Sequence, residues 1–130
     1  MSTQPEDIEI YIKDVQLEDC LAWLKQVFKS VEITNENKSG FRGNCLYCDH
    51  QNKEHQVPIQ VMHKAVGKFT CLWFNYPNTP WESDQACARD AFQQFQKNVR
   101  CTPGSWQADQ DPDLWWQISP EGEGEIIWKG

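Results

Sequence analysis

The sequence has no long hydrophobic run, and none of its apolar stretches approaches the ~20 residues that a membrane-spanning helix requires. Its first ten residues, MSTQPEDIEI, lack both the basic start and the apolar centre of a secretory signal peptide. We therefore expect a cytoplasmic protein with no membrane partner, whose six cysteines are free thiols rather than disulfides.

Basic side chains are also scarce. The chain has 12 Lys and Arg against 19 Asp and Glu, which gives a formal net charge of -7 at pH 7. Binding to phosphate groups needs clustered Lys and Arg, so this charge balance argues against nucleic acid as a partner.

The common motifs of enzymes are missing too. The sequence contains no G-x-S-x-G, no P-loop, no G-x-G-x-x-G and no H-E-x-x-H. Three histidines and nineteen carboxylates could form an acid–base pair in space, but the sequence cannot choose among them. An enzyme with an unrecognised active site stays an alternative, and we assign no catalytic residue.

What the chain does contain is enough apolar and aromatic material for one folded domain. At 130 residues it should bury roughly two-thirds of the surface of its unfolded chain. Aromatic residues make up 12% of the sequence, which predicts a bulky core. We expect residues 1–130 to form a single domain, with residues 1–6 as a disordered lead-in.

Two apolar runs in the middle of the chain predict a hairpin at the centre of a sheet. Val57, Ile59 and Val61 alternate with other residues, which is typical of a strand with one buried face. The run from 69 to 74 is apolar on both faces, as in a central strand covered on two sides. Gly67 lies between the runs and can take the positive φ of a tight turn.

The first of two predicted helices begins after a possible N-cap at Asp14. Its apolar residues recur at helical spacing between 17 and 28 and form a single stripe. Before this helix, Ile8, Ile10 and Ile12 alternate with polar residues and predict a strand.

The second predicted helix begins at Thr79, which is followed by Pro80 and Glu82 in the pattern of a capping box. A start capped by Ser83 or Asp84 is the alternative. The residues expected on its buried stripe are Trp81, Ala88, Phe92, Phe95 and Val99.

The complete order is strand, helix, four strands, helix, and then two or three strands. Residues 28–76 are predicted to form an antiparallel meander, because their loops are short. We therefore predict an α+β fold in which an antiparallel sheet carries both helices on one face.

Cys45 and Cys48, followed by His50 and His55, are the candidate metal ligands, because thiolates and imidazoles at this spacing can hold tetrahedral Zn²⁺. If residues 41–50 form a strand, however, the two cysteines point to opposite faces. We therefore expect no cofactor, and a zinc-binding protein is kept as an alternative.

Charge is unevenly distributed along the chain. Residues 1–100 carry 13 acidic and 11 basic side chains, a net charge of -2, whereas residues 101–130 carry six acidic and one basic, a net charge of -5. This last segment also holds four of the seven tryptophans and predicts a C-terminal hairpin.

The hairpin is the candidate binding surface. Alternation places Leu114, Trp116 and Ile118 on the core face, and we expect Trp115 and Ile127 on the opposite face. An exposed Trp rimmed by carboxylates suits a basic protein partner. The predicted binding residues are Trp115, Asp109, Asp111, Asp113, Glu121 and Glu123.

The alternative is that Trp115 lies under its own loop, residues 109–113, and that the acids only keep the protein soluble. Under the leading hypothesis the chain is a small binding module that recognises another, basic protein. An inhibitor or immunity protein that blocks a basic enzyme has this size and charge, by analogy alone.

Overall fold

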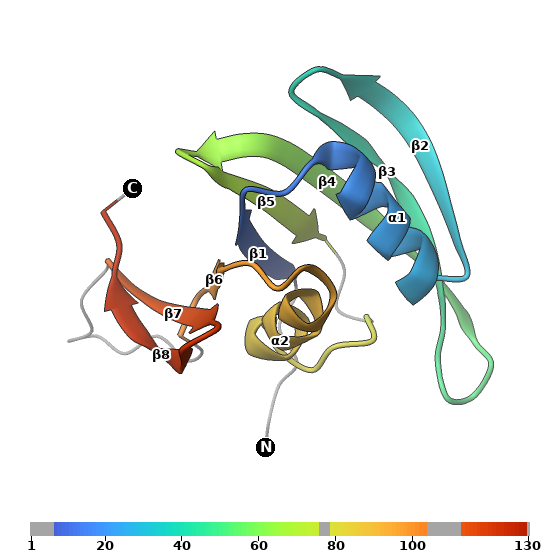
Figure 1. The fold of residues 1–130 in the computed structure, drawn as a ribbon. Helices are drawn as coiled ribbons and strands as arrows, with labels where there is room; N and C mark the ends of the chain where they lie inside the picture. Colours follow the sequence, from blue (N-terminus) through green and yellow to red (C-terminus); the bar gives the residue numbers. More distant parts are fainter. Residues whose placement is uncertain (1–6, 76–78, 104–112, 130) are drawn as a thin grey trace.

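In a computed structural model, eight strands and two helices occupy the residues that the structure describes, which are 7–75, 79–103 and 113–129 (Figure 1). All strands belong to one antiparallel sheet with the order β2-β3-β4-β5-β1-β6-β7-β8. The elements are β1 (Ile8–Lys13), α1 (Leu17–Val27), β2 (Ser30–Asn37), β3 (Gly40–Cys48), β4 (Glu54–Val66), β5 (Phe69–Phe74), α2 (Asp84–Phe95), β6 (Val99–Cys101), β7 (Leu114–Ser119) and β8 (Gly122–Ile127).

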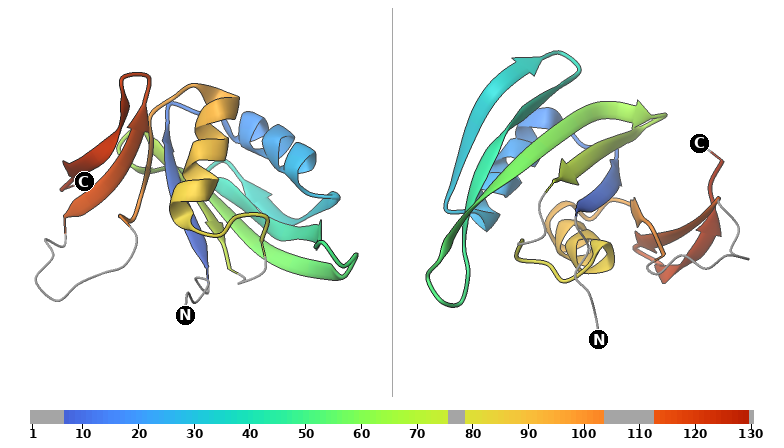
Figure 2. Two further views of the ribbon diagram at one scale, coloured as in Figure 1. Left: turned by 90° about the horizontal axis from the view of Figure 1, so that it is seen from below. Right: turned by 180° about the vertical axis from the view of Figure 1, so that it is seen from behind.

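The predicted α+β class is confirmed. Strands β2 to β5 form the predicted meander, and both helices pack on one face of the sheet, as the views in Figure 2 show. Three strands follow α2. Strand β5 is buried at five of its six residues, which agrees with its prediction as a central strand.

Strand β1 lies inside the sheet and pairs antiparallel with both β5 and β6. Strands β5 and β6 therefore run parallel to each other on either side of β1. Parallel strands need a long crossover connection, and α2 provides it between them. Every second residue of β1 is buried against the helices: Ile8, Ile10 and Ile12.

The N-caps of both helices differ from the leading predictions. Helix α1 is preceded by Gln16, whose side chain makes no capping hydrogen bond. Asp14 instead takes a left-handed backbone conformation (φ 53°), and its N–H donates to the Lys68 carbonyl at 2.9 Å. Helix α2 is capped by Ser83, whose hydroxyl accepts from the Ala86 N–H at 3.1 Å.

Thr79 is therefore not the N-cap of α2, and the alternative start at Ser83 is correct. The Thr79 hydroxyl accepts from the Trp81 N–H at 3.3 Å and donates to the Trp81 carbonyl at 3.1 Å. This local turn holds Trp81 in the core before the helix begins, so the apolar indole belongs to the entry loop and not to the helical stripe.

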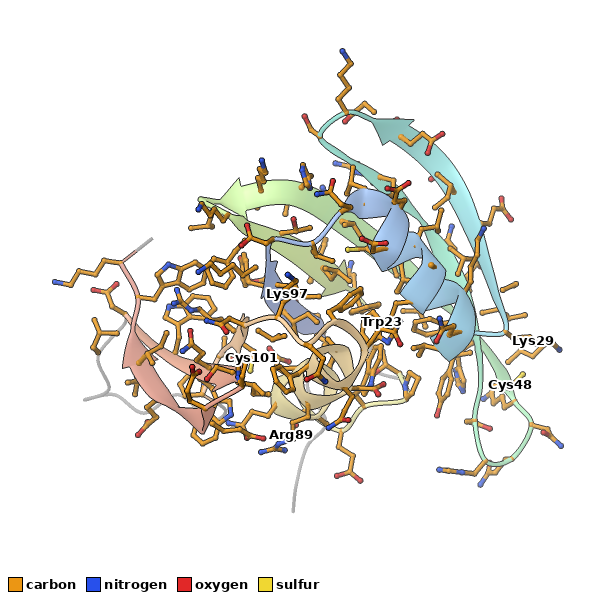
Figure 3. The ribbon with its side chains drawn as sticks, viewed as in Figure 1. Trp23, Lys29, Cys48, Arg89, Lys97 and Cys101 are labelled. Atoms are coloured by element: carbon orange, nitrogen blue, oxygen red, sulfur yellow. The ribbon has the colours of Figure 1, made fainter. Side chains whose placement is uncertain are left out.

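Trp81 is the centre of the aromatic packing between the helices and the sheet. Its ring stacks on Trp23 of α1 at 5.7 Å and contacts Phe74 of β5 at 5.0 Å. Phe28, just after α1, meets the Trp81 ring edge-on at 5.8 Å. The indole N–H of Trp81 donates to the Asp90 carboxylate at 3.1 Å. Figure 3 labels Trp23 between the two helices.

Small residues bring α2 close to the sheet. The helix buries Cys87, Ala88 and Ala91 completely, whereas the predicted stripe residues Phe92 and Phe95 are half-buried. Large side chains at the three buried positions would hold the helix away from β1 and β6, so the closest contact falls on Ala and Cys.

The cysteines are unpaired thiols, and all of them except the half-buried Cys48 are buried. Burial raises the pKa of Cys20, Cys45, Cys71 and Cys101 to about 12, so these thiols stay protonated and unreactive at neutral pH. Within the described residues there is no helix whose length and hydrophobicity would allow it to span a bilayer.

We expect Trp81→Ala to lower the free energy of unfolding by about 3–5 kcal/mol, because it removes a buried aromatic that joins both helices to β5. Urea denaturation of the two proteins measures the difference. Trp81→Phe keeps most of the ring contacts and should cost clearly less. A loss below about 1 kcal/mol for the alanine variant would contradict this account of the core.

Candidate functional site

The C-terminal hairpin, strands β7 and β8, forms one end of the sheet (Figure 2). Its register places Trp115 opposite Ile126 and Leu114 opposite Ile127. Residues directly opposite each other share a face, so Trp115 and Ile127 lie on opposite faces. Our expectation that these two side chains share a surface is therefore wrong; the strands meet with Ile126 beside Trp115.

Trp115 belongs to a cluster of rings on the face of the sheet that carries no helix. Its ring meets Tyr11 of β1 at 5.5 Å and Trp128 at 5.0 Å, both edge-on. Trp128 in turn lies 4.9 Å from Phe69 of β5. We call Tyr11, Phe69, Arg100, Trp115 and Trp128 the outer aromatic cluster.

Arg100 of β6 lies over two rings of this cluster. Its guanidinium lies 4.4 Å from the centre of the Phe69 ring and 4.7 Å from that of Trp128. Its Nε donates to the Gln117 side chain of β7 at 2.8 Å. Burial lowers the pKa of Arg100, and such desolvated cation–π contacts are stronger than exposed ones. Trp115 itself is half-buried, because its ring packs against Tyr11 of β1 and Trp128.

The acidic residues of the hairpin lie elsewhere. Glu123 shares the helix side of the sheet with Trp116 and Ile118, and its carboxylate accepts from Arg89 of α2 at 3.0 and 3.1 Å. It also accepts from the Trp116 indole at 3.1 Å. The hydrogen bonds from Arg89 lower the pKa of Glu123. Figure 3 labels Arg89, which ties α2 to the hairpin.

The remaining acidic residues of the predicted binding surface differ in position and exposure. Glu121 is exposed in the turn between β7 and β8, and Asp113 is half-buried just before β7. Asp109 and Asp111 lie outside the described residues. Sequence reasoning missed Glu125, which is exposed on β8 opposite Trp116. The sequence could have indicated Glu125, because it lies two residues from Glu123 and therefore shares its face of the strand.

The candidate metal ligands do not converge. Cys45 is buried in the core, whereas Cys48 is half-buried and points to the other face of β3. His50 is exposed, and His55 contacts Asp49 at 2.9 Å, a hydrogen bond that lowers the pKa of Asp49 to about 2. Among the described residues, no group of three or more His, Cys, Asp or Glu could hold a metal ion.

A second group of carboxylates surrounds the start of α2. Burial raises the pKa of Asp84 to about 6, and the charges of Asp7 and Glu9 add to the increase. Hydrogen bonds from the Thr102 hydroxyl at 3.2 Å and the Glu9 amide act in the opposite direction. The sequence offered Asp84 only as a helix cap, because its contact with β1 is tertiary.

Comparison of the chain with protein-family models, with curated proteins and with solved structures finds no match.

We expect Trp115→Ala to lower the melting temperature by several degrees, because the ring packs on Tyr11 and Trp128 and contributes about 2 kcal/mol to the fold. Thermal unfolding monitored by circular dichroism tests this. Ile127→Ala is the control, since Ile127 is 54% exposed and should change the melting temperature little. Equal melting temperatures for wild type and the Trp115 variant would show that the outer aromatic cluster does not stabilise the fold.

The raised pKa of Asp84 predicts a stability that depends on pH. An unfolded Asp releases its proton near pH 3.9, whereas folded Asp84 holds it up to about pH 6. The folded state thus binds more protons within this window, and its stability falls as the pH rises from about 4 to 6. Asp84→Asn should remove roughly 2 kcal/mol of that fall.

Urea unfolding at pH 4, 5, 6 and 7 measures the effect. Glu18→Gln provides a matched control, because it changes an exposed carboxylate in the first turn of α1. Parallel pH profiles for wild type and the Asp84 variant would contradict the assignment.

Proposed function

We propose that this protein is a small binding module that recognises the basic surface of another protein through its C-terminal hairpin, in the manner of an inhibitor or immunity protein of the cytoplasm. The observation that carries the proposal is the exposure of Glu121, Glu125 and Ile127 together on the last hairpin of the sheet. Two carboxylates attract a basic partner over long range, and an exposed apolar side chain beside them supplies area to bury.

The hairpin is held in place by contacts on both of its faces. On the helix side, Glu123 anchors it to Arg89 of α2. On the other side, Trp115 and Trp128 fix it against Tyr11 of β1. A surface that is already ordered loses little conformational entropy when a partner binds, which favours affinity.

The other face of the hairpin, which carries Trp115, has no hollow of the size that usually encloses a small molecule among the described residues. The hollow lined by Tyr11, Val66, Trp115 and Trp128 has a volume of about 70 Å³. Pockets that enclose a small-molecule ligand usually measure about 300–1,000 Å³.

Affinity capture from a native lysate tests the proposal with a matched pair of charge reversals. The variant Glu121→Lys/Glu125→Lys changes the hairpin. The control Glu32→Lys/Glu36→Lys changes two exposed residues of β2, at the opposite end of the sheet, and alters the net charge equally. Circular dichroism verifies that both variants are folded.

We expect the wild type and the β2 control to capture the same basic protein and the hairpin variant to lose it. With that protein purified, the hairpin variant should associate at least tenfold more slowly at low salt, with a weaker salt dependence. Equal capture by both variants, or capture of acidic proteins only, would overturn the proposal.

A further inference from the structure

Strand β8 is the last strand of the sheet, and no described strand pairs with its outer edge. The direction of its backbone groups follows from one hydrogen bond, in which the Trp128 N–H donates to the Asp113 carbonyl at 2.8 Å. Continuing the register of the hairpin by one residue beyond Leu114 and Ile127 places these two residues opposite each other. In antiparallel pairs, hydrogen-bonded and non-hydrogen-bonded positions alternate.

The alternation assigns each residue of β8 a direction. Ile126, Gly124 and Gly122 share the parity of Trp128 and bond to β7. The N–H and C=O groups of Glu123, Glu125 and Ile127 therefore point away from β7, toward the outer edge. A row of unpaired backbone groups of this kind is a template for another strand.

The opposite edge of the sheet is protected. Strand β2 carries a register irregularity between Ile33 and Asn35, which interrupts the regular row of edge groups. The β7–β8 ladder runs without such a shift from Leu114 to Ser119. Of the two edges, β8 is thus the one with a regular spacing that a straight segment can match.

Gly124 adds an observation that the isolated fold does not explain. A Cβ built at this position would meet no atom within 4 Å. Glycine weakens a strand interior, and in strands it often marks a place where another backbone or ligand comes close. Here the missing side chain leaves a flat area beside Ile126 on the face without helices.

We propose that β8 binds an extended basic segment of the partner protein by strand addition, with backbone hydrogen bonds to Glu123, Glu125 and Ile127. This inference rests on the function proposed above and specifies how the hairpin recognises its partner. Main-chain hydrogen bonds would supply affinity, and alternating side chains would supply specificity.

The charges of the edge determine which segment fits. Side chains of an added strand that point to the helix side would lie beside Glu123 and Glu125, of which Glu125 is exposed and makes no described ion pair. Lys or Arg at every second position of the segment would complement them. Side chains on the other face would cover Gly124 and Ile126.

A second copy of this chain is a poor occupant of the same edge. Two β8 strands paired antiparallel about a two-fold axis at Glu125 would place the two Glu125 side chains directly opposite each other. Like charges in that position destabilise a strand pair. The same acidic edge therefore favours a basic partner and disfavours self-association.

The test uses the wild-type chain and a fluorescent seven-residue peptide in which Val and Lys alternate, beginning and ending with Val. One control peptide carries Glu in place of Lys. Two further peptides carry N-methyl groups, one on all Lys amides and the other on all Val amides. Because amide direction alternates along a strand, only one methylated set faces β8.

We expect the basic peptide to bind at least tenfold more tightly than the acidic one, and one methylated peptide to lose at least tenfold in affinity while the other keeps it. Hydrogen exchange of the Glu123, Glu125 and Ile127 amides should slow at least tenfold in the complex, and that of β2 amides should not change.

Two substitutions at one position separate charge from backbone. Glu125→Gln removes the carboxylate but keeps the N–H, whereas Glu125→Pro also removes an N–H that does not bond to β7. We expect a loss of a few-fold for Gln and at least tenfold for Pro. The methylated peptides keep the test decisive if the Pro variant does not fold.

Equal affinities of the two methylated peptides, or no change in exchange of the three edge amides, would overturn strand addition while leaving recognition of a basic partner intact. Failure of every peptide to bind would also overturn strand addition, and the capture experiment decides the proposed function independently. A dimer in sedimentation that Glu125→Pro dissociates would identify a second copy as the occupant.

Discussion

The pairing of β1 on both of its sides is the constraint on which the rest of the structure depends. This strand holds six residues of β5 on one side and three of β6 on the other, and it buries Ile8, Ile10 and Ile12 beneath the helices. Without β1, the meander of β2 to β5 and the strands after α2 would form two separate sheets. The crossover through α2 follows from the same constraint, since β5 and β6 run parallel.

The sheet narrows after β1, and this decides how the hairpin is held. Strand β6 is only three residues long, so the ladder alone gives β7 and β8 a short attachment. Side-chain contacts supply the remaining attachment of the hairpin. Glu123 bonds to Arg89 on the helix side, and the outer aromatic cluster packs on the other side. Contacts thus hold the hairpin from both faces, and no described strand pairs with its outer edge.

The outer edge of β8 borders both faces of the hairpin, and each face carries different side chains. Trp115 and the glutamates of β8 point in opposite directions, so a flat partner surface could not cover them together. A strand laid along β8 would reach both faces, because its own side chains alternate. This geometry suits the extended segment proposed above, whose side chains would meet acidic residues on one face and aromatic residues on the other.

The sequence by itself determined the elements and their class. These elements depend on residues that are close together in the chain, so the spacing of apolar residues predicts them. Examples are the alternation in 57–61, the helical stripe of 17–28 and the short loops of the meander. Only the tertiary structure decided the place of β1 between β5 and β6, the start of α2 at Ser83, and the opposite directions of Trp115 and Ile127. These depend on which distant residues meet, as Trp81 with Trp23 and Trp115 with Tyr11 do, and local periodicity carries no information about such contacts.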